Sequence, residues 1–289
     1  MSHPERDRRH TGVRRNHELH STRVPLARMC HYLSHTDRLA GIHDAAQPGP
    51  YEARSMTHIP PQKTVLLLGA SRGLGLAMAE GYLKRHWRVI ATERAGAPSK
   101  LHRLAQAYPG TLHIESVDIT LPEQVAALRQ RLHGKKLDLL FVNAGVKNDD
   151  RETIADVSTD EFIRVMVTNA LSPMRVIETF VDLVRPTGTI GAMSSGQGSI
   201  GNNTNGQYEV YRGSKAALNM FMRSFAARHR DDPRTLLLMA PGWVQTDMGG
   251  PEARLTIEES IPKLLDTIEA SAGRGGLNYL DYLGRVVPW

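Results

Sequence analysis

The sequence contains a single cysteine and no long apolar run, and both absences restrict what the chain can be. Cys30 stands alone among 289 residues, so no internal disulfide can form. No apolar run approaches the roughly 18 residues of a membrane-spanning helix, and none resembles the apolar core of a secretion signal. We therefore expect a soluble, cytoplasmic protein with no membrane partner.

The first sixty residues lack lysine and any regular hydrophobic pattern. They hold nine arginines, eight of the thirteen histidines and six acidic residues, so half of the net charge of +6 lies there. Such a segment cannot bury enough apolar surface to offset its ordering entropy, and residues 1–61 are expected to form a disordered, basic extension. His17 with His20, and His31 with His35, have spacings that a metal could use. Scattered histidines and arginines are more often solvated tail, so we expect neither a metal nor a nucleic-acid partner.

The remaining residues, 62–289, alternate short apolar runs with amphipathic stretches. This order indicates right-handed strand–helix–strand units, so we expect a single α/β domain built on a doubly wound parallel sheet. An apolar fraction of 40% is enough for one sizeable core. The expected strands are 64–68, 88–92, 111–116, 137–142, 188–193, 235–239 and 277–280, and the expected helices are 76–86, 99–108, 122–133, 159–184, 209–229 and 257–272.

A glycine-rich turn follows the first of these strands and opens a helix. Glycines allow positive φ and let the backbone approach a pyrophosphate, which the unpaired N–H groups of a helix N-terminus attract. A lone glycine-rich turn is often only a tight connection, but its place after a buried strand favours a dinucleotide site. The residues expected to contact the dinucleotide here are Gly69, Ser71, Arg72, Gly73, Leu74 and Gly75.

Tyr211 and Lys215 lie four residues apart in a predicted helix, so both side chains project from one face. A neighbouring cation favours the phenolate and is expected to lower the pKa of Tyr211 from about 10 toward neutrality, which suits an acid for carbonyl reduction. The spacing alone is weak evidence, because Tyr and Lys four apart occur on many solvated helix faces. The glycine turn upstream favours the catalytic interpretation.

The glycine turn and the Tyr211–Lys215 pair, with two segments between them, resemble the short-chain dehydrogenase/reductase family. The family's marks are a Thr-Gly-x-x-x-Gly-x-Gly turn, an Asn-Asn-Ala-Gly segment, a serine and a Tyr-x-x-x-Lys pair. This chain has all four marks in that order. Val142-Asn143-Ala144-Gly145 corresponds to the Asn-Asn-Ala-Gly segment, and Ser194-Ser195 contains the serine. Leu68 stands where the family usually has Thr, which puts the hydrogen bonding of the turn in doubt, and Val142 stands where it usually has the first Asn. Residues 193–200, 211–219 and 288–289 are similar to the sniffer and C-factor branch of carbonyl reductases.

The resemblance implies a Rossmann-type fold and an NAD(P)-dependent oxidoreductase that acts on the carbonyl or alcohol of a small molecule. In the catalytic set that it implies, Ser195 binds the carbonyl oxygen and Tyr211 gives up its proton. Lys215 holds the nicotinamide ribose, and Asn169 supports a water leading to that lysine. Ser194 and Ser199 are rivals to Ser195, which is preferred because the family's serine is the second of such a pair.

Further cofactor contacts follow the ends of later strands, where ligands bind in such sheets. By resemblance, Asp118 with Ile119 meets the adenine ring, although Asp118 could instead cap the helix near Thr120. The segments implied to line the adenosine ribose and the nicotinamide are Asn143, Ala144 and Gly145, and Pro241, Gly242, Val244 and Thr246. The Pro-Gly sequence could equally form an ordinary turn.

The charged residues near the end of the second strand and in the glycine turn give opposite indications about the cofactor. Glu93, eighteen residues beyond Gly75, sits where an acidic side chain would bond the ribose hydroxyls of NAD and repel a 2′-phosphate. Arg94 and Arg72 are placed to pair with that phosphate instead. The two arginines and the resemblance to carbonyl reductases favour NADP slightly over NAD.

A non-catalytic dinucleotide-binding signalling or sensor protein of the same fold is the main alternative function. The complete set of Asn169, Ser195, Tyr211 and Lys215 favours the enzyme, because a pure sensor has no need of a proton donor. The long helices predicted at 159–184 and 209–229 are surfaces through which relatives pair. We therefore expect a homodimer or homotetramer.

Overall fold

The computed structural model describes residues 62–96 and 99–289. The predicted basic extension, its histidine pairs and Cys30 lie outside the described residues. Within the described ranges, no helix combines the length and the apolar character needed to cross a membrane. The same residues contain no cluster of three metal-ligating side chains.

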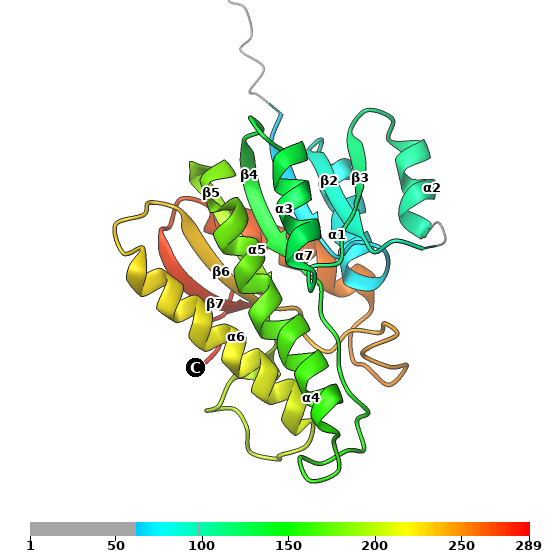
Figure 1. The fold of residues 1–289 in the computed structure, drawn as a ribbon, viewed down its shortest axis with the longest axis vertical. Helices are drawn as coiled ribbons and strands as arrows, with labels where there is room; N and C mark the ends of the chain where they lie inside the picture. The colour runs from blue at the N-terminus through cyan, green and yellow to red at the C-terminus, as the bar shows by residue number, and fades with distance from the viewer. Residues whose placement is uncertain (1–61, 97–98) are drawn as a thin grey trace, which may run out of the picture. The chain divides into compact units, whose positions relative to one another are not determined.

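Seven parallel strands form one sheet in the order β3-β2-β1-β4-β5-β6-β7 (Figure 1). Because the chain adds strands first on one side of β1 and then on the other, the sheet is doubly wound, as the alternating pattern predicts. The β1–β4 pair, where the winding direction reverses, aligns Val65 with Leu139 and Leu68 with Val142. The strands are β1 (Thr64–Leu68), β2 (Arg88–Glu93), β3 (Leu112–Ser116), β4 (Leu137–Val142), β5 (Val184–Met193), β6 (Thr235–Ala240) and β7 (Gly276–Asp281).

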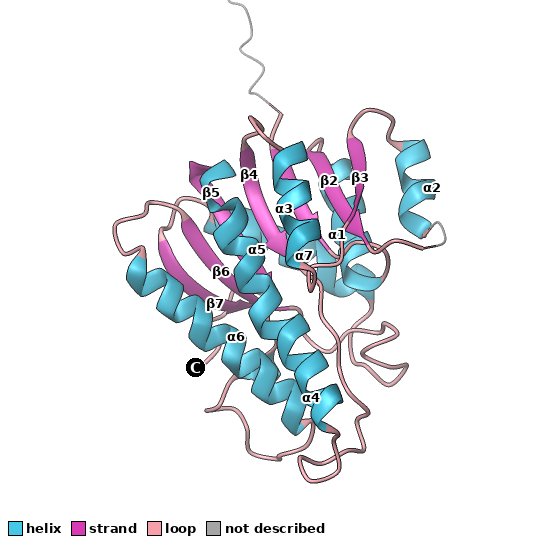
Figure 2. Cartoon of the chain, in the orientation of Figure 1, coloured by secondary structure: helices cyan, strands magenta, loops and turns pink. Residues whose placement is uncertain are grey.

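Helices cover both faces of the sheet, and alternate strand residues feed two separate apolar clusters (Figure 2). In β1, Leu66 and Leu68 pack in the cluster under α3, α5 and α6, whereas Val65 and Leu67 pack under α1, α2 and α7. Burial on both faces explains why the central strands are almost continuously apolar. The α-helices are α1 (Gly73–Lys84), α2 (Lys100–Ala107), α3 (Pro122–Arg131), α4 (Thr159–Met166), α5 (Ser172–Phe180), α6 (Glu209–Arg228) and α7 (Ile257–Ser271).

The single helix predicted over 159–184 is wrong, because the structure divides this segment. Helix α4 passes into a π-helical turn, Val167–Leu171, before α5 begins. Pro173 in the first turn of α5 has no N–H for the carbonyl four residues earlier, and the Ser172 N–H bonds the Val167 carbonyl five residues back. Val184 belongs to β5, where it pairs with Leu137.

Candidate active site

The glycine turn between β1 and α1 has the backbone conformation that the sequence predicts. Gly69 and Gly73 have φ values of 88° and 54°, which side-chain-bearing residues rarely adopt. A Cβ at Gly75 would lie 2.0 Å from the Gly69 carbonyl oxygen. The N-cap residue of α1, Arg72, gives the first turn no side-chain acceptor. The N–H groups of this turn therefore suit an anionic group such as a pyrophosphate.

The turn is held in place although Leu68 replaces the expected threonine. The Gly69 N–H donates to Thr92 Oγ1 at 3.0 Å, and Asn143 Nδ2 donates to the Gly69 carbonyl at 2.7 Å. The Leu68 carbonyl accepts the N–H groups of Asn143 and Ala144, both at 2.9 Å. Thr92 on β2 thus supplies a hydroxyl to the turn, a contact that sequence reasoning missed.

Two of the three charged residues that bear on cofactor choice, Glu93 and Arg72, contact protein groups of opposite charge or hydrogen-bond donors. The Glu93 carboxylate accepts a hydrogen bond from Ser99 Oγ, and its Oε1 lies 3.3 Å from His102 Nδ1. Arg94 is exposed. Arg72 Nη1 pairs with Asp247 at 3.1 Å, and both of these side chains are exposed. In this structure Glu93 and Arg72 are therefore already engaged with protein partners.

Asp118 bonds to Thr120 just before α3, but it does not cap that helix, whose N-cap residue is Leu121. Its Oδ1 accepts hydrogen bonds from the Thr120 N–H at 2.9 Å and the Thr120 hydroxyl at 2.7 Å. This is an Asx turn before α3. The side chain of Ile119 is buried in the apolar cluster beneath that helix, so the expected adenine contact cannot come from an Ile119 side chain lying in the crevice.

Tyr211 and Lys215 share one face of α6, as their spacing predicts. Lys215 Nζ lies 5.7 Å from the centroid of the Tyr211 ring. The Lys215 side chain is buried, and Nζ donates to the Met193 carbonyl at 2.8 Å. Because Met193 ends β5, the amine is held at the carboxyl edge of the sheet, on the same side as the glycine turn.

The expected acidification of Tyr211 is wrong in this structure. Desolvation raises the pKa of Tyr211 to about 12, and the interaction of its hydroxyl with the Ser195 side chain only partly offsets that rise. Burial also lowers the pKa of Lys215 to about 8. Desolvation disfavours the charged form of each group, and it is the largest influence on both pKa values.

Among the three candidate serines, Ser195 is the one whose side chain interacts with the Tyr211 hydroxyl. Ser195 Oγ also accepts the Gln197 N–H at 3.1 Å. Ser194 Oγ instead donates to Asn219 Oδ1 at 2.6 Å, in a buried pair. Ser199 Oγ accepts a backbone N–H in the following loop. The geometry therefore favours the preferred serine over its two rivals.

Asn169 is fully buried on the π-helical turn, where its amide links two parts of the site. Its Oδ1 accepts the Val146 N–H at 2.8 Å, and its Nδ2 donates to the Val146 carbonyl at 2.7 Å. Nδ2 also contacts Ser214 Oγ at 2.9 Å, and that hydroxyl donates to the Tyr211 carbonyl at 2.7 Å. A Cβ on Gly145 would lie 3.3 Å from Asn169 Oδ1 and 3.5 Å from Lys215 Nζ.

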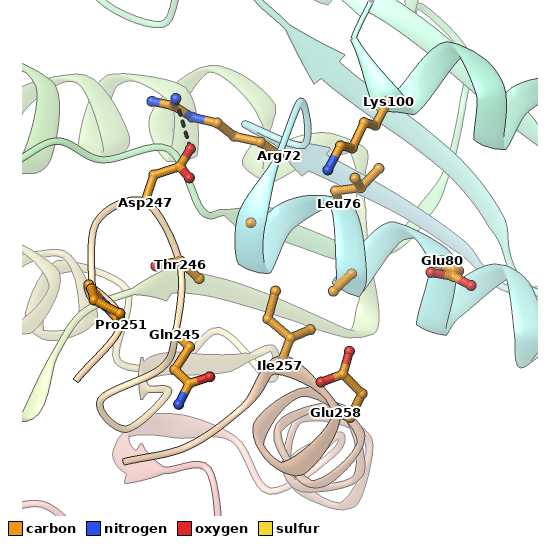
Figure 3. Close-up of a pocket in the computed structure, with 13 residues that line it drawn as sticks. Arg72, Leu76, Glu80, Lys100, Gln245, Thr246, Asp247, Pro251, Ile257 and Glu258 are labelled. Atoms are coloured by element: carbon orange, nitrogen blue, oxygen red, sulfur yellow. Dashed lines mark hydrogen bonds and ion pairs between the residues drawn. The ribbon is translucent and has the colours of Figure 1, made fainter. Parts of the chain in front are cut away.

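The segment after β6 lies against the glycine turn. A Cβ on Gly73 would be 3.7 Å from Thr246 Cγ2. Gly242 has a φ of 86°, and the Pro241 carbonyl accepts a hydrogen bond from Ser260 Oγ. Val244 is buried and forms an isolated β-bridge with Leu255. A cavity of about 530 Å³ lies here. Figure 3 shows its lining residues, with Arg72 reaching toward Asp247. Its lining also includes Lys100, which sequence reasoning did not single out.

Tyr279 on β7 is a further residue that sequence reasoning missed at this site. Its hydroxyl donates to the Ser195 carbonyl, and its ring lies 5.4 Å from that of Trp289. The Trp289 carbonyl in turn accepts the Gly201 N–H at 3.0 Å. Because Tyr279 is far from Ser195 in sequence and follows no motif, only the fold brings it to the loop after β5.

Comparison with known proteins agrees with this arrangement. The profile of the family described as short chain dehydrogenase matches residues 63–254. C-signal of Myxococcus xanthus is 37% identical over 155 residues, which cover 53% of this chain and 93% of that protein. A short-chain dehydrogenase/reductase from Burkholderia multivorans, solved with bound NADP, is 60% identical, with a TM-score of 0.78 over 79% of this chain and 100% of that one. Carbonyl reductase Sniffer of D. melanogaster is 27% identical, with a TM-score of 0.72 and the same coverage of both chains. This chain therefore belongs to the short-chain dehydrogenase family, in its sniffer- and C-factor-like branch, and is an oxidoreductase.

Proposed function

We propose that this protein is an NADP(H)-dependent reductase of small aldehydes, ketones or quinones, with Tyr211 as the proton donor. The observation that carries the proposal is the juxtaposition of Tyr211, Ser195 and the buried Lys215 amine at the carboxyl edge of the sheet. The glycine turn opens at the same edge. The similarity to a relative solved with NADP and to a carbonyl reductase supports the same reaction class.

The residues present fit a nicotinamide dinucleotide. The glycine turn offers N–H groups to the pyrophosphate, and a side chain at Gly75 would collide with that turn. Gly145 leaves open the space next to Lys215 Nζ, where the amine would hold the nicotinamide ribose. Thr246, beside Gly73, would border the nicotinamide end. When bound, the reduced nicotinamide supplies the hydride that the carbonyl carbon accepts.

The protonation state of Tyr211 favours reduction over oxidation. A phenol with a pKa of about 12 stays protonated at neutral pH, so it has a proton to give to a carbonyl oxygen that becomes strongly basic. Ser195 would donate a hydrogen bond to the same oxygen as negative charge develops there. The phenolate left on Tyr211 would then face the Lys215 ammonium, which stabilises it and supports its reprotonation. Alcohol oxidation needs a phenolate at the start, and this environment makes that form scarce.

A dinucleotide-binding signalling protein is the second candidate, favoured by the 37% identity to C-signal of Myxococcus xanthus. Such a protein would bind the dinucleotide and need no proton donor. The network that joins Asn169 through Ser214 to the Tyr211 backbone positions the catalytic helix closely. That arrangement favours the enzyme.

The test is a panel of aldehydes, ketones and quinones assayed separately with NADPH and NADH, on the wild-type protein and on Tyr211→Phe. The variant should bind NADPH as the wild type does and lose about 10²-fold or more of its turnover. Tyr208→Phe is the matched control: Tyr208 is the N-cap residue of the same helix, its side chain makes no capping hydrogen bond, and loss of its hydroxyl should leave turnover unchanged. Full turnover in Tyr211→Phe would refute the proposed acid. Tight NADPH binding with no turnover on any substrate would favour the signalling protein.

A further inference from the structure

An acidic residue stands at the end of β2, yet the first turn of α2 holds its carboxylate. Glu93 accepts a hydrogen bond from the Ser99 hydroxyl, and its other oxygen lies 3.3 Å from His102 Nδ1. The Glu93 side chain is only 11% exposed. Ser99 is itself fixed, because its Oγ also accepts the Leu101 N–H at 3.1 Å as the N-cap of α2. Both oxygens of the carboxylate therefore face protein groups.

This arrangement bears on cofactor selectivity through the chemistry of the adenosine ribose. A carboxylate with free lone pairs at this position accepts hydrogen bonds from the two ribose hydroxyls and repels a 2′-phosphate. The hydrogen bond from Ser99 uses one of those lone pairs, and His102 Nδ1 lies 3.3 Å from the other oxygen, so both partners hold the carboxylate toward α2. The carboxylate is therefore less available to the ribose hydroxyls that would favour NAD.

Two cationic side chains, one at the start of α1 and one in the first turn of α2, line the cavity described above. They are Arg72 and Lys100; Figure 3 shows the Lys100 amine beside Leu76, whereas the Arg72 side chain extends away from it toward Asp247. The cavity also carries Glu80, Asp247 and Glu258, and Arg72 is paired with Asp247. A 2′-phosphate would give Arg72 a more highly charged partner than the exposed Asp247 carboxylate, and it would give Lys100 an anionic partner once the Arg72 side chain turns toward it.

We propose that the first turn of α2 selects NADP: Ser99 and His102 hold Glu93 away from the ribose hydroxyls, while Lys100 joins Arg72 in binding the 2′-phosphate. The inference rests on the proposed function, because it takes the dinucleotide to bind at the glycine turn. It explains how an acidic residue at the end of β2 is compatible with NADP.

The experiment measures dissociation constants of NADPH and NADH by quenching of protein fluorescence, so it needs no substrate. The wild type should bind NADPH more tightly. Ser99→Ala should reduce the NADPH-to-NADH preference by about tenfold, because the released carboxylate then faces the phosphate. Ser99→Thr keeps the hydroxyl and should retain the wild-type preference. The double variant Ser99→Ala with Glu93→Gln should recover it, since the charge is gone.

Two further variants separate the parts of the inference. His102→Ala should shift the preference in the same direction as Ser99→Ala, and Lys100→Ala should weaken NADPH binding while NADH binding stays unchanged. An unchanged preference in Ser99→Ala, or no recovery when Glu93→Gln is added, would overturn the selectivity mechanism. A wild type that prefers NADH would overturn it too, together with the NADP(H) preference in the proposed function, and would leave carbonyl reduction with Tyr211 as proton donor standing. A wild type that binds neither dinucleotide would instead refute the proposed function.

Discussion

The buried amine of Lys215 should make the stability of this protein depend on pH in a way that one substitution removes. Burial lowers the pKa of Lys215 from 10.5 to about 8. In the unfolded chain the amine returns to its ordinary value, so between these two pH values the unfolded state binds more protons. Stability then rises with pH across that window, because deprotonation relieves the cost of burying the charge.

The size of the effect follows from the same shift. Below about pH 8 the folded protein bears nearly the full cost of the buried ammonium, about 3 kcal/mol at 1.36 kcal/mol per pKa unit. At about pH 9.5 the linkage relation leaves about 1 kcal/mol of that cost. The wild type should therefore gain about 2 kcal/mol relative to Lys215→Met between about pH 7 and pH 9.5.

Urea denaturation of both proteins at the two pH values measures this difference. The lost hydrogen bond to the Met193 carbonyl and any change in packing are the same at both pH values, so they cancel in the comparison, as do the shared tyrosines. Lys136→Met is the control, since this lysine is exposed and should give no such difference. Parallel pH profiles for wild type and Lys215→Met would refute the view that Lys215 is buried as a charged group.

Three further outcomes are expected. Gly75→Ala should abolish NADPH binding and lower the melting temperature, because its Cβ would lie 2.0 Å from the Gly69 carbonyl; fluorescence titration and calorimetry measure the two effects. Thr92→Val should cost about 1–3 kcal/mol in urea denaturation, since the N–H of Gly69 loses its acceptor. The rate of carbonyl reduction should fall as pH rises through about 8, where Lys215 loses the charge that stabilises the Tyr211 phenolate; initial rates at saturating NADPH test this, and a flat profile would contradict it.

Local patterns predicted most of the fold. The alternation of apolar runs with amphipathic stretches was sufficient to predict the parallel sheet. The four-residue spacing was sufficient to predict that Tyr211 and Lys215 share a helix face. Both predictions depend on residues that are close in the sequence. The division of the predicted 159–184 helix depends on Pro173 and on Val184 pairing with a distant strand. That pairing has no local signal.

The electrostatics of the site could not be predicted in the same way. The pKa of Tyr211 rises because the fold removes water from it, and the sequence spacing gives only the position of the cation. Glu93 has the position expected of an NAD-binding carboxylate, but its partners Ser99 and His102 come from the next helix. Thr92 and Tyr279 reach the site across the sheet, so no motif marks them.

The amide of Asn169 meets Val146 as one strand residue meets another, with one bond to its N–H and one to its carbonyl. One side chain on a helix thus makes the pair of hydrogen bonds that a neighbouring strand would make. The same amide also contacts Ser214, whose hydroxyl donates to the Tyr211 carbonyl. These hydrogen bonds couple the segment after β4 to helix α6, so the two segments cannot move independently. The same carboxamide therefore helps to set the space between Gly145 and Lys215, which is the space proposed above for the nicotinamide ribose.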